Sequence, residues 1–198
     1  MNNLLTRLGI PLEVQAFFNA TPDLSFSYGD QYERYGEGFH IVPSTTNLWF
    51  AGTQHATDLI ITYSAMEAIA FITLNRHRYP RLEQLAFVAI GNRLHPGQGE
   101  WIGQHFPCRK VILAFGKDLV GHLTDIKLTS AIKNIPVRIL HRDAEIHIYR
   151  NSRLRVFHQE QVSLHAFQES FGIRPRFRTA KSVRSLTFLD QLKYESER

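Results

Sequence analysis

Residues 111–128 read VILAFGKDLVGHLTDIKL, and this stretch decides the fold class. Its first part, residues 111–115, is a continuous apolar run closed by Gly116-Lys117-Asp118. Such a run is typical of a strand that is buried on both faces of a sheet. The residues that follow have the apolar spacing of a helix from about 119 to 132. A strand that leads directly into a helix predicts one unit of a parallel α/β sheet.

The same alternation continues on both sides of this stretch. Upstream, residues 59–62 and 85–90 are further apolar runs, and residues 96–106 have the pattern of a short helix. Between the two runs, Ser64 is a suitable N-cap and Glu67 stands at the position of a capping box. Downstream, residues 137–140 supply a fourth run. We therefore predict an α/β, Rossmann-like core at residues 57–142, with a parallel four-stranded sheet and flanking helices.

The flanking segments predict smaller elements packed beside this core. In residues 1–56 we expect a helix or helix pair around Pro11 and a small antiparallel β element that includes residues 39–42 and 48–50. In residues 143–198 we expect a hairpin, residues 144–149 and 154–158, then a helix that begins after Ser163, then a basic strip that ends in a short helix. The length of 198 residues favours one compact unit with these appendages.

Composition bounds the environment of the protein. The chain has one cysteine, Cys108, so it has no internal disulfide, and no zinc site can be assembled from one thiol and scattered histidines. We expect Cys108 to be a partly buried structural residue. No apolar segment approaches the length that spans a bilayer. These features predict a cytoplasmic protein that has no membrane partner.

Positive charge is concentrated in the last third of the chain. Residues 138–198 hold 12 Lys and Arg against 7 Asp and Glu, so this segment carries the whole net charge of +5. Such a field attracts polyanions, although a solvated surface with an ordinary basic bias is an equal alternative.

Polar residues follow the predicted parallel strands at the edge where ligands bind in such sheets. They are Tyr63, Ser64 and Glu67 after the first run, Gly91-Asn92 after the second, and Gly116, Asp118 and Gly121 after the third.

These segments resemble the toprim domain, the metal-binding module shared by bacterial primases, topoisomerases and some nucleases. The resemblance covers roughly residues 57–140 and rests on ITYSAMEAIAF (61–71), FVAIGN (87–92) and VILAFGKDLVGHLTDIKL (111–128). In that family the first strand ends in a Glu followed by an Asp, the second in a glycine turn, and the third in Asp-x-Asp before a helix start that contains glycine. The flanks are similar in layout to primase-like proteins of bacterial mobile elements.

The departures from the family pattern imply a degenerate site. Tyr63 stands where the family has its general acid/base Glu, and Gly116 replaces the first Asp, while Glu67, Asp118 and Gly121 occupy matching positions. Phosphoryl transfer needs carboxylates that hold Mg²⁺ and a group that moves a proton. A tyrosine, with a pKa near 10, does neither well at neutral pH. We expect no cofactor, or at most weak Mg²⁺ binding by Glu67 and Asp118.

Each of these residues also has a structural interpretation. Glu67 fits its capping-box position without a metal, and Asp118 suits a helix start, where a carboxylate favours the helix dipole. Tyr63 suits a core aromatic with a satisfied hydroxyl, or a ring that stacks on a base.

The basic tail predicts a nucleic-acid surface, with DNA favoured over RNA. Its arginines suit forked recognition of phosphate, and interleaved aromatics suit stacking, although a plain positive surface is an equal alternative. The candidate contact residues are Arg150, Arg153, Arg155, Arg174, Arg176, Arg178, Lys181 and Arg184.

Three functions are consistent with these features. The first is a toprim-like protein without catalysis that binds nucleic acid, or acts as an accessory factor, in bacterial DNA replication or mobile-element biology. The second is a Mg²⁺-dependent nuclease or primase-type nucleotidyl transferase that uses Glu67, Asp118 and Asp125 in a rearranged site. The third is an interaction scaffold that binds a protein through the aromatic block Tyr28, Tyr32, Tyr35 and Trp49. The sequence leans away from an enzyme and does not indicate the oligomeric state.

Overall fold

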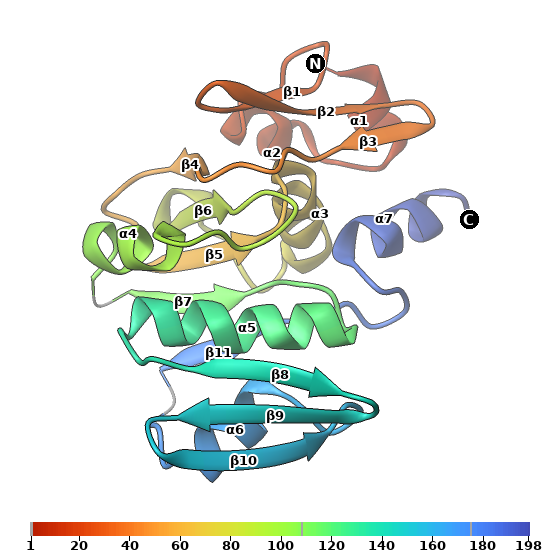
Figure 1. The fold of residues 1–198 in the computed structure, drawn as a ribbon. Helices are drawn as coiled ribbons and strands as arrows, with labels where there is room; N and C mark the ends of the chain where they lie inside the picture. The colour runs from red at the N-terminus through yellow and green to blue at the C-terminus, as the bar shows by residue number, and fades with distance from the viewer. Residues whose placement is uncertain (1, 108, 175) are drawn as a thin grey trace.

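A five-stranded sheet forms the centre of the computed structural model, which describes residues 2–107, 109–174 and 176–198 (Figure 1). Cys108 lies outside the described residues, so its predicted burial does too. The strand order is β11-β7-β5-β6-β4. The predicted parallel strands are confirmed for β5 (Asp58–Thr62), β6 (Leu85–Ala89) and β7 (Lys110–Leu113). Two flanking segments add edge strands: β4 (Trp49–Gly52) runs antiparallel to β6, and β11 (Phe177–Thr179) runs parallel to β7.

The predicted fourth parallel strand forms, but its assignment to the central sheet is wrong. It is β8 (Arg138–Arg142), which belongs to a separate antiparallel sheet with β9 (Glu145–Arg150) and β10 (Arg153–His158). Asp143 has a left-handed φ of 53° in the turn after β8. This tight turn returns the chain at once, so β8 pairs with β9 as a hairpin. The basic strip supplies β11 in its place, beside β7.

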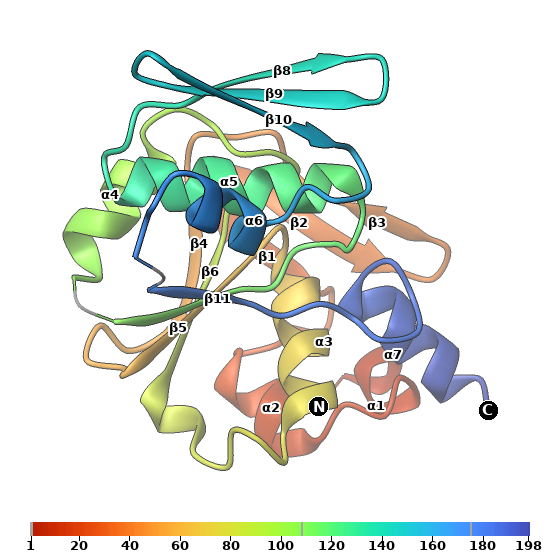
Figure 2. The ribbon, with the colours of Figure 1, turned by 90° about the horizontal axis from the view of Figure 1, so that it is seen from below.

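Helices cover both faces of the central sheet (Figure 2). The buried side chains of β5 alternate, with Ile60 in one core and Leu59 and Ile61 in the other. The Ile60 face carries α1 (Asn3–Arg7), α2 (Leu12–Phe17), α3 (Ala65–Asn75) and α7 (Phe188–Ser196). The opposite face carries α4 (Gln98–His105), α5 (Leu119–Ile132) and α6 (Leu164–Ser170). None of the helices in the described ranges is long and apolar enough to cross a membrane.

Predicted caps fix where the helices begin. The Ser64 hydroxyl accepts the N–H of Glu67 at 3.1 Å, and the Ser163 hydroxyl accepts the N–H of Ala166 at 3.1 Å. The bounds of α5 agree with the prediction of 119 to 132. A short 3₁₀ turn (Leu82–Gln84) leads into β6.

The amino-terminal segment forms its own antiparallel sheet, with strands β1 (Ser25–Tyr28), β2 (Gln31–Gly36) and β3 (Phe39–Ile41). This sheet lies at the β4 end of the molecule (Figure 1). The small β element predicted there is confirmed for β3, whereas the predicted strand at residues 48–50 joins the central sheet as β4.

Candidate functional site

Tyr63 lies at the carboxyl end of β5, where the toprim resemblance places an acid/base group. Its hydroxyl is 2.7 Å from Oγ1 of Thr124, and its ring centroid is 4.6 Å from that of Phe115. Burial, and to a lesser degree the negative charges of Asp118 and Asp125, raise the pKa of Tyr63 to about 12. Tyr63 is therefore a neutral, largely buried phenol at physiological pH, and it is packed as a core aromatic.

Asp118 begins α5. Its carboxylate accepts the N–H of Gly121 at 2.9 Å, which is the helix-start role expected of it. Gly121 is required by the close approach of the loop after β7, because a Cβ there would stand 1.9 Å from the carbonyl oxygen of Gly116. The sequence from 116 to 121 is thus explained by the packing of one tight turn.

Glu67 has a different role from the one expected. Only half of the predicted capping box forms, because the Glu67 side chain turns away from Ser64 toward the start of α7. Its Oε2 accepts the N–H groups of Phe188 at 3.1 Å and Leu189 at 3.2 Å. Burial raises the pKa of Glu67, and its hydrogen bonds act in the opposite direction.

The two candidate metal ligands thus cap helices on opposite faces of the central sheet, α7 for Glu67 and α5 for Asp118. In the described part of the chain, no three His, Cys, Asp or Glu residues gather as a metal-binding group. The nuclease or primase alternative gains no support from this placement.

Lys181 and Asp125 form an ion pair near the same edge of the sheet. Lys181 Nζ is 2.7 Å from Asp125 Oδ2, and it also donates to the carbonyl oxygen of Gly116 at 2.9 Å. Asp125 is fully buried, and its Oδ1 has no hydrogen-bond partner among the described residues. Burial raises the pKa of Asp125 to about 6, although Lys181 opposes that shift. Lys181 is therefore an internal counter-ion as well as a candidate phosphate ligand.

Three candidate arginines lie in the β8–β10 sheet, where Arg153 and Arg155 are exposed and Arg150 is half-buried. In the register of this sheet, Arg150 and Arg155 share a face with the buried Ile148. Arg150 donates to the carbonyl oxygen of Phe171 at 2.9 Å, and Arg155 donates to that of Ser170 at 3.2 Å. These two side chains satisfy the carboxyl end of α6. Arg153 lies opposite Arg150 beside the turn and is exposed.

Other candidates lie around β11, the edge strand of the central sheet. A cavity of about 980 Å³ lies beside β11, between the end of α3 and the start of α7. Asp58 is the one acidic residue among its described lining residues. The Lys and Arg residues that line this first cavity are Arg78, Lys110, Arg176, Arg178 and Lys181.

A second cavity, of about 740 Å³, lies between β11 and the carboxyl end of α5 and shares Lys110 and Arg176 with the first. Burial, together with the positive charge of Arg176, lowers the pKa of Lys133 in its wall. Lys133 Nζ lies 5.4 Å from the ring centroid of Phe177. Its described lining includes no acidic residue, and its Lys and Arg residues are Arg109, Lys110, Lys133, Arg174 and Arg176.

We call the cations of both cavities the β11 basic band. Arg184, the last of the sequence candidates, is exposed in the loop after β11 and lines neither cavity. Sequence reasoning missed the members that follow α3, that stand at the start of β7 and that follow α5, since only the fold brings them beside β11. The band consists of Arg78, Arg109, Lys110, Lys133, Arg174, Arg176, Arg178 and Lys181.

The aromatic block of the amino-terminal segment is mostly core. Tyr28, Tyr35 and Trp49 are buried, while Tyr32 is 49% exposed. The Tyr28 hydroxyl donates to Glu33, a fully buried carboxylate that sequence reasoning missed. Most of this block therefore stabilises the fold, and Tyr32 alone of the four is available to a partner.

Comparison of the chain with family models, with curated proteins and with solved structures finds no match in any of the three. The toprim resemblance therefore rests on the sequence runs alone.

Proposed function

We propose that this chain binds nucleic acid through the β11 basic band and is a toprim-like protein that has lost catalysis. The observation that supports the proposal is the composition of the two cavities. Eight Lys and Arg side chains line them, with Asp58 as the one acidic residue among the described lining. A surface of this kind attracts phosphates and releases their counterions on binding.

The crowding of the cations favours a polyanionic ligand. Arg176 borders both cavities, and its charge contributes to the lowered pKa of Lys133. A phosphate between these side chains would relieve their repulsion and accept forked hydrogen bonds from the guanidinium. The two cavity volumes, about 980 and 740 Å³, lie within the range of roughly 300–1,000 Å³ that is usual for ligand pockets in proteins.

Loss of catalysis follows from the groups that replace the family's acids. Tyr63 has a pKa of about 12 and bonds to Thr124, so it is a poor proton acceptor. Glu67 and Asp118 are engaged by backbone N–H groups. The proposed setting is DNA replication or mobile-element biology, with DNA as the ligand in preference to RNA.

Titration of a fluorescent oligodeoxynucleotide at several salt concentrations tests the proposal. We expect log K to fall linearly with log salt concentration, because phosphate contacts displace counterions. The double variant Arg176→Ala/Arg178→Ala should bind more weakly, with a slope smaller by about one for each arginine removed. A parallel titration with an RNA of the same sequence tests the preference for DNA.

The matched control removes two exposed arginines that line neither cavity, Arg34→Ala/Arg93→Ala. This control should keep the affinity and slope of the unmodified protein. Absent binding, or binding that ignores salt, would overturn the proposal. An equal loss in both double variants would show that the β11 basic band is not the site.

A further inference from the structure

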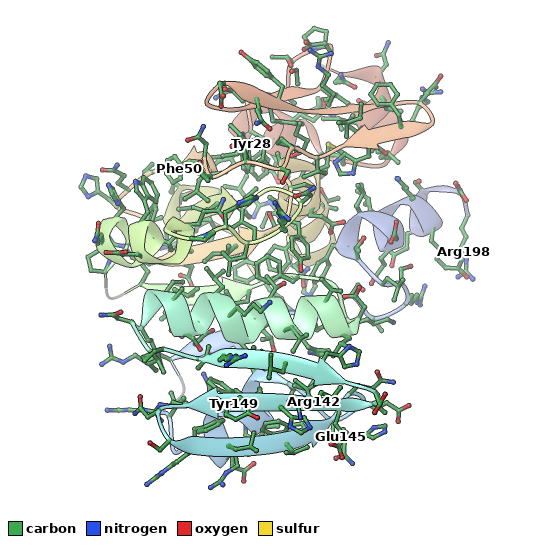
Figure 3. All side chains as sticks on the ribbon, viewed as in Figure 1. Tyr28, Phe50, Arg142, Glu145, Tyr149 and Arg198 are labelled. Carbon is green, nitrogen blue, oxygen red and sulfur yellow. The ribbon has the colours of Figure 1, made fainter. Side chains whose placement is uncertain are left out.

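One face of the β8–β10 sheet is open. In β9, the side chains of Ile146 and Ile148 are buried against the second core, so Glu145, His147 and Tyr149 lie on the opposite face. Helices α5 and α6 both lie on the Ile148 side of this sheet (Figure 2). Figure 3 shows Tyr149, Arg142 and Glu145 on the side of the sheet that faces the viewer. No helix or strand of the described residues covers this side.

The register sets the composition of this open face. Tyr149 stands between Arg138 of β8 and Leu154 of β10, and the next row pairs His147 with Leu140 and Val156. Leu154 is 39% exposed and Val156 47% exposed. We call this surface the platform face. It comprises Arg138, Leu140, Arg142, Glu145, His147, Tyr149, Leu154 and Val156.

We infer that the platform face is a second nucleic-acid surface, on which bases of a single strand stack over Tyr149. The inference deepens the proposed function and rests on it for the class of ligand. The residues of the two surfaces are different, so each can be tested alone. A base offers a flat π-face of any sequence, and aromatic side chains on an open sheet are suited to receive it.

The charges of the platform face favour a nucleic acid over a protein. Arg138 and Arg142 stand at the two ends of β8, with Arg142 directly opposite Glu145. Among the described residues, neither arginine has an acidic side chain within ion-pair distance. The acid of the face, Glu145, is 2.9 Å from His147. Tyr149 is half-buried between its cross-strand neighbours, so one face of its ring is open to a base. Cores of protein interfaces are depleted in charge, whereas arginines beside such a ring suit phosphates flanking a stacked base.

A single strand is favoured over a duplex because duplex bases are already stacked on one another and cannot lie on Tyr149. The platform face also lies next to the second cavity. Ile135 lines that cavity, and β8 begins three residues later at Arg138. One strand can therefore hold its phosphates in the β11 basic band and lay neighbouring bases on the platform face.

Two matched probes test this inference, a labelled oligothymidylate and an abasic oligomer of the same length with the same phosphates. The unmodified protein should bind the thymidylate about 5- to 150-fold more tightly, which is the range of one stacked base. Tyr149→Leu keeps apolar volume but loses the ring, and should bind both probes equally. Tyr149→Phe keeps the ring and should retain the preference.

The band variant Arg176→Ala/Arg178→Ala separates this inference from the proposed function. Its affinity for both probes should fall by the same factor, and its preference for the thymidylate over the abasic oligomer should be unchanged. The inference that bases stack on Tyr149 would be wrong if Tyr149→Leu kept the preference for thymidylate, or if Tyr149→Phe lost it as completely as Tyr149→Leu does. Neither result would contradict binding by the β11 basic band. Failure of the unmodified protein to bind either probe would overturn both.

Discussion

The Glu67 carboxylate on α3 accepts the backbone N–H of Phe188, 121 residues further along the chain, at 3.1 Å. The Glu33 carboxylate on β2 likewise caps the start of α3, because it accepts the backbone N–H groups of Ala65 at 2.6 Å and Met66 at 3.0 Å. These two carboxylates link the amino-terminal sheet to α3, and α3 to the last helix. Acidic groups near the carboxyl end of β5 thus hold helix starts in place, where the helix dipole favours negative charge.

Replacing Glu33 should be the most costly of the single carboxylate changes. Its buried side chain has four partners, which include Tyr28 at 2.9 Å and His40 at 2.9 Å. Glu33→Ala should lower the free energy of unfolding by about 3–5 kcal/mol, because several buried polar groups lose their partner. Urea denaturation measures the loss. The control is Glu37→Ala, which removes an exposed ion pair with Arg7 near the same sheet and should cost less than about 1 kcal/mol. Similar losses of unfolding free energy in both variants would contradict the role of Glu33 as a buried cap.

Replacing Glu67 should destabilise α7 rather than remove an ion. Glu67→Ala should cost about 1–2 kcal/mol, as other helix caps do, and Glu67→Gln should recover part of it by keeping one acceptor. Native-state hydrogen exchange should show faster exchange of the α7 amides in the alanine variant, with Glu160→Ala in an exposed turn as control. Unchanged exchange in α7 together with lost Mg²⁺ binding would instead favour the metal role.

The order of helices and central strands is predictable from local pattern, whereas the edges of the central sheet are not. The runs that became β5, β6 and β7 are apolar at every position but the ends, which marks burial on both faces. Strand β8 is also apolar in part, but the turn at Asp143 makes it pair with β9 and not with the central sheet. The apolar pattern of β8 alone does not indicate this pairing. Strand β11 has three residues, one of which is Arg178, and is too short for any periodic signal.

The candidate site also contains some contacts that local sequence pattern predicts and others that it does not. The cap at Asp118 follows from its place between a strand and a helix, so sequence predicts it. The Glu67 contact and the Lys181–Asp125 pair join residues more than 50 positions apart, and no local pattern encodes them. The face on which Arg150 and Arg155 lie is set by the strand register, and a shift of one residue would reverse every side chain in the strand.

The Asp125 carboxyl should make stability depend on pH. Its pKa is about 6 in the folded protein against 3.8 as the ordinary value, so the native state holds the proton more tightly. The contribution of this group is therefore fully present below about pH 4 and is lost as pH rises through 6. The shift corresponds to about 3 kcal/mol. The stability of the unmodified protein relative to Asp125→Asn should fall by about 2–3 kcal/mol between pH 4 and pH 7.

Urea titrations at each pH give this difference, and other titrating groups cancel because both proteins share them. Asp143→Asn, in an exposed turn, serves as the control and should track the unmodified protein at every pH. A pH-independent difference between Asp125→Asn and the unmodified protein would show that Asp125 stays ionised in the fold.

Arg150 and Arg178 look alike in the sequence, but the fold assigns them different tasks. Arg150 donates to Phe171 at the end of α6, whereas Arg178 lines the first cavity and is exposed. Arg150→Ala should lower the free energy of unfolding by about 1–2 kcal/mol, because a backbone acceptor loses its charged donor, and should keep the salt slope of oligonucleotide binding. Arg178→Ala should leave stability within about 0.5 kcal/mol and reduce that slope by about one. Denaturation and salt titrations on the same two samples measure both quantities. A reduced salt slope in Arg150→Ala would mean that the inner face of the β8–β10 sheet also contacts phosphate. In that case Arg150 would have a binding role, and phosphate contacts would not be confined to the β11 basic band.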